Sequence, residues 1–269
     1  MTGFLFEGPA WLLARFYDLT DSYALAISMI ALVVMLITAP LQLKATKGML
    51  EMQRLQPQLR KLQQQHRGDR QKLNEEMMKL YQEHKVNPLA SCFPLLLQFP
   101  VFIIMFQVLH GLTNKVNGTF VPKYLSEDSS LYLSLLGKNE MLSFGLDLAK
   151  RPIDAMSEFG GEALVYALLV VALGGLYYLQ QRMVAARAAV SPTMSPTQQK
   201  IMQYLPVVFA VFLIFYVTGL VVYYMAQAIF RIGLQAYTTK RFYRGDESLG
   251  RQAQKASEAA REMAKTDGG

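Results

Sequence analysis

The chain has 269 residues and carries 27 lysines and arginines against 20 aspartates and glutamates, a net charge of +7 at pH 7. Hydrophobic residues make up 52% of the sequence and charged residues only 17%, which is too apolar for an ordinary soluble domain and excludes intrinsic disorder. A single cysteine, Cys92, excludes an internal disulfide framework. Several stretches approach the ~18–20 uncharged residues that cross a bilayer as a helix, so the sequence predicts an all-α integral membrane protein.

The N-terminal segment 1–21 is expected to lie outside the membrane core. Residues 4–17 combine an apolar face with Trp11 and Tyr17. Amphipathic aromatic side chains favour the membrane–water interface, so this stretch is predicted to be a helix that lies on the membrane rather than crossing it.

Apolar segments further along the chain predict five transmembrane helices, at 22–42, 88–112, 163–181, 200–217 and 219–238. The last two come from one long stretch whose only charge is Arg231. As a single helix it would exceed the ~30 Å hydrocarbon core, so a break is predicted at Thr218-Gly219. One steeply tilted helix is the alternative.

Between the first two spans, residues 43–87 predict a basic hairpin of two antiparallel helices. Gly68 suits the end of the first helix and Asp69 the start of the second, while Pro57 is expected to kink or open the first. The simplest interpretation is that this hairpin is a solvated linker between the two spans. Flexible thioethers suit a surface that touches varied apolar partners, which makes four methionines candidate contact residues: Met49, Met52, Met77 and Met78.

The distribution of basic residues predicts the orientation. Ten lysines and arginines lie between 41 and 90, and more follow in the 182–199 loop and in the tail 239–269. By the positive-inside rule these segments face the cytoplasm, whereas the N-terminus and the polar loop 113–162 face outside. Anionic lipid headgroups and ribosomal RNA both suit the basic hairpin, and charge alone does not separate them.

A specific signature lies in the run from 49 to 102. Asn87-Pro88, Cys92-Phe93-Pro94 and Leu97-Gln98-Phe99-Pro100 fit the pattern NPL…CxPLLxQxP, and SPTQQKIMQYLPVVF and GLVVYYMAQ follow at 195–209 and 219–227. Together these residues resemble the YidC/Oxa family of membrane protein insertases. The resemblance covers roughly 23–240, and it is to the short forms that lack the large periplasmic domain.

The resemblance implies a five-span core with a cytoplasmic hairpin and a hydrophilic groove open to cytoplasm and lipid. It implies insertion and folding of nascent membrane proteins, alone or beside the Sec translocon, in the plasma (inner) membrane of a bacterium. The expected partners are nascent membrane proteins, the ribosome, the Sec translocon and membrane lipids. One residue departs from the family pattern: five residues before Pro40, where the family usually has an arginine, this chain has Met35.

Polar side chains at helical spacing identify the candidate substrate groove. Together with Met35, which shares a helix face with the polar residues of the first span, they are Thr38, Gln42, Gln98, Tyr224, Gln227 and Arg231. Polar groups are unsatisfied in lipid, so these faces are expected to point at each other or at water. Arg231 either supplies the groove charge that is missing at Met35 or snorkels to the headgroups.

Apolar side chains at the lipid edge of such a groove would receive the apolar part of a client. The candidates for this hydrophobic slide are Phe99, Phe106, Val217 and Leu220, each of which equally fits plain lipid-facing packing.

Two other functions remain open, a membrane assembly scaffold that binds clients without inserting them and, less well supported, a small solute transporter. No Ser/His/Asp, paired-carboxylate, phosphate-loop or metal-ligand pattern occurs in the sequence. Neither an enzyme nor a cofactor is therefore expected.

Overall fold

The computed structural model describes residues 3–87, 93–158, 160–185, 204–205, 207–245 and 247–266. The chain divides into two compact units, and each is described by itself. The first unit comprises 1–37, 97–179 and 206–231, and the second comprises 38–96, 180–205 and 232–269.

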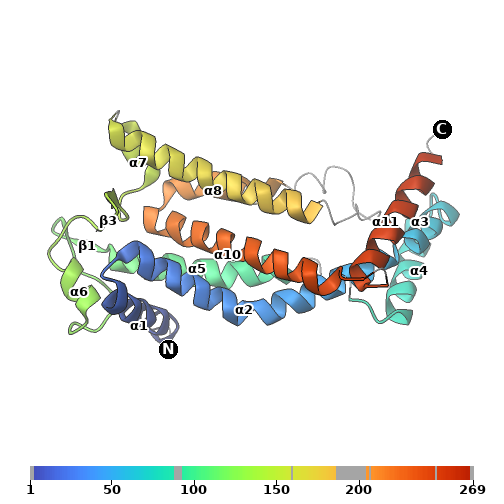
Figure 1. The fold of residues 1–269 in the computed structure, drawn as a ribbon, viewed down its shortest axis with the longest axis horizontal. Coiled ribbons are helices and arrows are strands. Elements are labelled where there is room, and N and C mark those ends of the chain that lie inside the picture. Colours follow the sequence, from blue (N-terminus) through green and yellow to red (C-terminus); the bar gives the residue numbers. More distant parts are fainter. Residues whose placement is uncertain are drawn as a thin grey trace. The chain divides into compact units, whose positions relative to one another are not determined.

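Long helices form most of the first unit and can be followed in Figure 1. They are α1 (Gly3–Thr20), the first part of α2 (Tyr23–Arg54), most of α5 (Phe93–Leu112), most of α8 (Gly161–Ala185) and the first part of α10 (Thr218–Phe242). One continuous hydrophobic core joins all of them, with Ile27 of α2, Met105 of α5, Tyr177 of α8 and Tyr223 of α10 among its buried residues.

Two helices in the described part of the chain are long and apolar enough to cross a membrane, Tyr23–Arg54 and Gly161–Met183, and a shorter apolar helix covers Leu96–Leu112. An apolar helix in a soluble protein would be covered by its neighbours. In contrast, only 17% of the most apolar window of α8 is buried, and Leu164, Leu168 and Val171 stand exposed on it. Such a surface suits contact with lipid.

The helical conformation is interrupted immediately before α10. A short 3₁₀ helix, η2 (Leu213–Phe215), follows helical residues 207–212, and Tyr216 is extended. The break therefore comes about two residues earlier than the sequence predicts, and the described residues do not form the single long helix. Thr218 N and Gly219 N donate to the carbonyls of Lys150 and Leu148, which satisfies two of the free amides at the start of α10.

The segment between α5 and α8 has more structure than its polar sequence indicates. It contains two β-hairpins, β1 (Lys115–Val116) with β2 (Thr119–Phe120) and β3 (Leu142–Ser143) with β4 (Leu146–Asp147). Two short helices are also present, α6 (Ser130–Leu135) and α7 (Pro152–Ser157). The apolar run at 131–136 belongs to α6, which buries Leu131 and Leu135.

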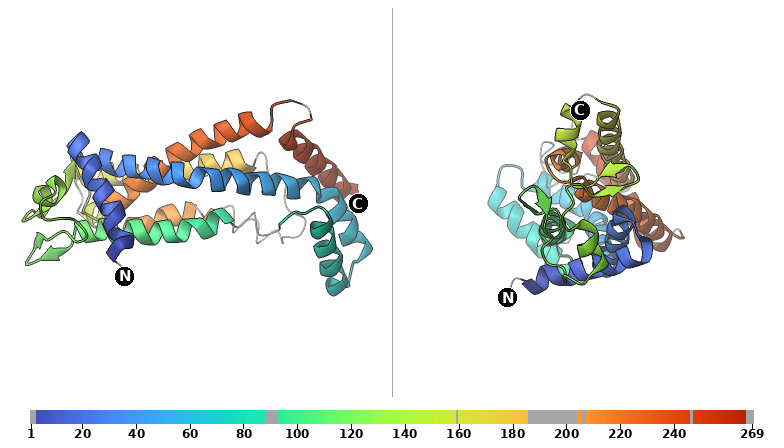
Figure 2. Two further views of the ribbon diagram at one scale, coloured as in Figure 1. Left: turned by 90° about the horizontal axis from the view of Figure 1, so that it is seen from below. Right: turned by 90° about the vertical axis from the view of Figure 1, so that its left-hand side faces the viewer.

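The second unit contains the end of α2 and three further helices, α3 (Gln56–Gln65), α4 (Arg70–Glu83) and α11 (Leu249–Thr266). Figure 2 shows α3 and α4 side by side. Asp69 caps α4 by accepting from Lys72 N, and Gly68 adopts a positive φ of 100° beside it. A small apolar core of Leu55, Leu59, Tyr81 and Val86 joins α3 to α4.

The helix that enters this unit differs from the expected pattern. The sequence predicts a hairpin helix distinct from the first span, but α2 runs without interruption from Tyr23 to Arg54. The break comes at Leu55, because Pro57 occupies the first turn of α3, where its missing N–H has no partner to lose. The tail 249–266 is helical and α11 packs on α3; three small residues of α11 are buried, Ala253, Ser257 and Ala260.

Candidate functional site

A chain of polar side chains crosses between α5 and α10 inside the first unit. Arg231 Nη2 donates a short hydrogen bond to Gln98 Oε1, and Gln98 Nε2 donates to the Tyr224 hydroxyl at 3.3 Å. The two helices bring together residues more than 120 positions apart. One amide thus accepts from a cation and donates to a phenol, and it keeps a second N–H and a second lone pair for further partners.

Aromatic packing holds the Tyr224 end of this chain in place. Tyr224 is fully buried. Its ring centroid lies 6.4 Å from that of Phe102 in a tilted arrangement, and 5.3 Å from that of Phe209 and 5.1 Å from that of Tyr223 in edge-to-face arrangements. Edge-to-face pairs of this kind stabilise a fixed ring orientation. The hydroxyl is therefore fixed at the position where Gln98 can reach it.

Arg231 at the other end is only half-buried and incompletely paired. Within the described part of the chain its Nε is buried without a hydrogen-bond partner. A guanidinium has five donors, and a charged group with a free donor in apolar surroundings favours any acceptor that reaches it. The site therefore offers a cation, a fixed amide and an open hydrogen-bond donor.

The remaining groove candidates do not all join this chain. Gln227 is buried and donates to the Tyr223 hydroxyl at 3.3 Å, so it points into the core. Met35 is also buried, with 3% of its surface exposed. Thr38 and Gln42 belong to the second unit, where Gln42 Nε2 donates to Thr38 Oγ1 at 3.0 Å.

The four slide candidates have very different exposures. Phe99 is 58% exposed, and Phe106 and Val217 are half-buried. Leu220 is fully buried in the core of the first unit, so it packs against protein and does not line a surface. The expectation for Leu220 is corrected accordingly.

Sequence reasoning missed an aromatic row beside the slide. The ring centroid of Phe106 lies 5.2 Å from that of Tyr216 and 6.0 Å from that of Phe102. The ring centroid of Phe212 also lies 5.2 Å from that of Tyr216. The i, i+4 spacing of Phe102 and Phe106 on α5 was a visible signal. The contribution of Tyr216 was not visible, because it depends on the extended backbone before α10.

The methionines of the hairpin divide into packed and exposed residues. Met52 and Met77 pack against the small core of the second unit, Met49 is half-buried, and Met78 is 48% exposed. Of the four, Met78 has the side chain best placed to meet a partner. The sequence had treated all four alike.

Ionisable groups on this hairpin also have shifted pKa values. Lys79 Nζ donates to Glu76 Oε1 at 2.7 Å, which lowers the pKa of Glu76 and raises that of Lys79. Burial against the small apolar core raises the pKa of Tyr81. The Glu76–Lys79 pair is exposed, so it contributes little to the stability of the hairpin.

The signature residues from Pro88 to Cys92 lie outside the described residues, as do the side chains of Phe93 and Pro94 and the start of the predicted span 200–217. The signature residues that are described include Gln98, which carries the polar chain, and Phe99, which is exposed.

Comparisons with known proteins cover most of the chain. The family model described as "60Kd inner membrane protein" matches residues 15–245. Curated relatives named "Membrane protein insertase YidC" include those of Magnetococcus marinus, 34% identical over 239 residues, Maridesulfovibrio salexigens, 33% over 220, and Pasteurella multocida, 32% over 240. The alignments cover 88%, 82% and 89% of this chain but 36%, 35% and 37% of the relatives. The chain therefore spans about a third of the length of these relatives.

Proposed function

The chain belongs to the 60Kd inner membrane protein family, to which the YidC insertases belong, and on that basis we propose that it inserts nascent membrane proteins into a bacterial inner membrane. The observation that carries this proposal for the chain itself is the Arg231–Gln98–Tyr224 chain, a polar path within an apolar bundle. No covalent chemistry is required, since the task is to lower a dehydration barrier.

The proposed mechanism uses the half-buried guanidinium of Arg231, whose hydrogen-bond donors are not all paired within the described residues. A client segment that enters the membrane carries polar flanks, and moving these through hydrocarbon without partners costs several kcal/mol for each group. Arg231 and Gln98 offer hydrogen bonds to such a flank, best to an acidic one, because a guanidinium pairs with carboxylates in a bidentate geometry. Arg231 thereby takes the role of the groove arginine that is absent at Met35.

The apolar part of the client needs a different surface. Phe99 and the half-buried Phe106 and Val217 lie on α5 and beside the start of α10, so we place the hydrophobic slide there without Leu220. Apolar client residues would move along these side chains into lipid while the flank stays paired. Thr38 and Gln42 belong to the second unit and stay sequence-based candidates for the groove, and the buried Gln227 would support the path from within the core.

The proposed topology has five spans, with the N-terminus outside and the basic hairpin and tail in the cytoplasm. The apolar helices α2, α5 and α8 support three of these spans. In this arrangement the hairpin and α11 carry basic surfaces toward the ribosome and anionic lipids, and the membrane bundle would work alone or beside the Sec translocon.

The test is insertion by the purified full chain in liposomes, with a single-span client that has an acidic flank and protease protection as the measurement. We expect Arg231→Ala to reduce insertion by about ten-fold or more, since hydrogen bonds to charged groups contribute ~1.5–3 kcal/mol. Arg231→Lys should retain part of the activity. Arg231→Gln, which keeps a donor for Gln98 but loses the charge, should lose most of it.

A client with a neutral flank is the matched control, because its insertion should change little in all three variants. Thermal unfolding of each variant checks that the bundle is intact. If Arg231→Gln inserted the acidic client as well as the native chain, the charge would have no role. If the native chain captured clients by cross-linking but never protected them from protease, the protein would be an assembly scaffold rather than an insertase.

A photocrosslinker at Phe99 tests the slide separately, with Leu220 as the buried control position. Capture of nascent chains is expected at Phe99 and not at Leu220. Equal capture at both positions, or capture at Leu220 alone, would exclude the proposed surface.

A further inference from the structure

The two β-hairpins between α5 and α8 share one turn geometry but not one turn sequence. Asn117-Gly118 connects β1 to β2 with φ values of 51° and 87°, and Phe144-Gly145 connects β3 to β4 with 52° and 77°. Two successive residues of positive φ in a two-residue loop indicate a type I′ turn, for which Asn-Gly is the preferred sequence. A bulky aromatic residue at positive φ is strained.

The side chain of Phe144 is not stabilised by burial in the core of the protein. Its side chain is 76% exposed, and Leu142, two residues earlier, is 57% exposed. Asparagine at position 144 would serve the fold better, as Asn117 does in the other hairpin. A residue that is both strained and apolar at an exposed turn indicates a contact outside the chain.

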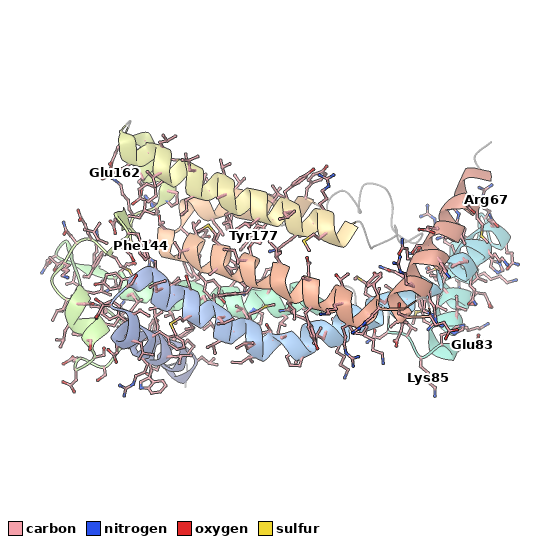
Figure 3. The ribbon with its side chains drawn as sticks, in the orientation of Figure 1. Arg67, Glu83, Lys85, Phe144, Glu162 and Tyr177 are labelled. Atoms are coloured by element: carbon pink, nitrogen blue, oxygen red, sulfur yellow. The ribbon has the colours of Figure 1, made fainter. Side chains whose placement is uncertain are left out.

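Hydrogen bonds attach this hairpin to the first turns of two apolar helices. Ser143 Oγ accepts from Ala24 N at 3.2 Å and bonds to Ser22 Oγ at 3.0 Å, at the start of α2. Asp147 N donates to the Tyr166 hydroxyl of α8 at 3.1 Å, and that hydroxyl donates to Asp147 O at 3.0 Å. Figure 3 labels Phe144 at this end of the first unit, near the beginnings of α2 and α8.

These attachments fix the depth of the hairpin along α8. Tyr166 comes five residues after Gly161, which is ~7–8 Å along a helix axis at ~1.5 Å per residue. Each interfacial layer of a bilayer is of similar thickness, since ~40–45 Å in total encloses a ~30 Å hydrocarbon core. Leu164 and Leu168 are already exposed and apolar at this level of α8. With the start of α8 at the outer edge of the bilayer, this spacing would put the turn level with the membrane interface.

We propose that Phe144 is an interfacial anchor, which inserts into the phospholipid headgroup region of the leaflet where α2 and α8 begin. An aromatic ring at this level is favoured by the interface, and the two pairs of hydrogen bonds pass the resulting constraint to both helices. The other hairpin carries no aromatic residue at its turn: Lys115, Asn117 and Thr119 are exposed and polar, and Val116, 48% exposed, is the one exposed apolar side chain among its described residues 115–120.

The test places one tryptophan at either turn of the full chain, in a Trp11→Phe background and in liposomes that contain lipids brominated near the headgroup. We expect Phe144→Trp to show blue-shifted emission and to lose most of it to the brominated lipid. Asn117→Trp is the matched control, because it puts the same ring at the same φ in the other hairpin. Its emission should stay red-shifted and unquenched.

A second reporter shows that phenylalanine itself provides the anchor. With tryptophan at Leu142, adding Phe144→Asn should reduce quenching by lipid, while circular dichroism stays unchanged because asparagine accepts the turn geometry. Emission from position 144 that matches position 117 would overturn the proposal. A blue shift without lipid quenching would also overturn it, since the ring would then contact protein. Neither readout needs client insertion, so the anchor can fail while the insertase proposal stands.

Discussion

The two units of the protein place positive charge in opposite surroundings. In the first unit Arg231 lies half-buried, and it donates a hydrogen bond to the neutral amide of Gln98. In the second unit, lysines and arginines lie on exposed helix surfaces around the small apolar core of Leu55, Leu59, Tyr81 and Val86. A single cation in apolar surroundings depends on its specific partners, whereas solvated cations on a helix surface contribute little to the stability of the fold.

The largest effect should come from the small core of the second unit. Leu59→Ala removes a side chain that is 1% exposed, and we expect it to lower the free energy of unfolding of the hairpin by ~2–5 kcal/mol. Hydrogen exchange of the full chain measures this, because protection should fall in α3 and α4 but not in α5 and α10.

Lys61→Ala is the matched control, since Lys61 is exposed two residues away and its loss should change protection little. If Lys61→Ala loosened the hairpin as much as Leu59→Ala, the charges rather than the apolar core would hold the second unit together.

A second prediction concerns the pairing of Arg231. Gln98→Leu removes the acceptor and leaves the guanidinium without its partner, so thermal stability in detergent should fall by the equivalent of ~1–3 kcal/mol. Adding Arg231→Met should restore much of that loss, because removing both partners costs less than leaving one unpaired. The double variant should nevertheless remain defective in insertion.

Tyr224→Phe is a control with a smaller expected change, because the bond from Gln98 to this hydroxyl is neutral and long at 3.3 Å. If the double variant were less stable than Gln98→Leu alone, Arg231 would stabilise the bundle through contacts other than Gln98.

Helical spacing indicated the contacts of Gln98, Tyr224 and Arg231 better than that of Gln227. Helical spacing placed Tyr224, Gln227 and Arg231 on one stripe, but seven residues return to within ~20° of the same direction whereas three miss it by ~60°. Tyr224 and Arg231 therefore both meet Gln98, while Gln227 turns to Tyr223. An angular offset of ~60° still leaves Gln227 within the stripe of the sequence pattern, but it is enough to change which residue its side chain can reach by a hydrogen bond.

Helix boundaries were predictable where a residue imposes them. Asp69 and Pro57 mark the start of α4 and of α3 in the structure as their chemistry indicates. The end of the first apolar segment marked no helix boundary, because a helix does not stop where its surroundings change, and α2 continues to Arg54. The hairpins between α5 and α8 were not predicted, since their strands have only two residues each.

A smaller change is expected from a substitution at an exposed residue of the second unit, Met78. Met78→Ser is expected to weaken cross-linking of apolar clients to the hairpin by about two- to five-fold, the equivalent of ~0.5–1 kcal/mol for partial burial of one methionine. Met78→Leu keeps an apolar side chain and should retain most of the capture. Equal capture by the serine and leucine variants would place the client elsewhere on the hairpin.

The smallest effect should come from a solvated ion pair. The bond from Lys79 lowers the pKa of Glu76 below its ordinary value of 4.5, so the pair contributes above that value and its contribution is lost as pH falls through the lowered pKa. Glu76→Gln should slightly flatten the acid side of the pH dependence of hairpin unfolding, measured by circular dichroism. Glu75→Gln removes the same charge without removing that hydrogen bond, so it should leave the acid limb steeper than Glu76→Gln does. A large change from Glu76→Gln would contradict the contrast between the units, because a solvated pair would then match Arg231 in importance.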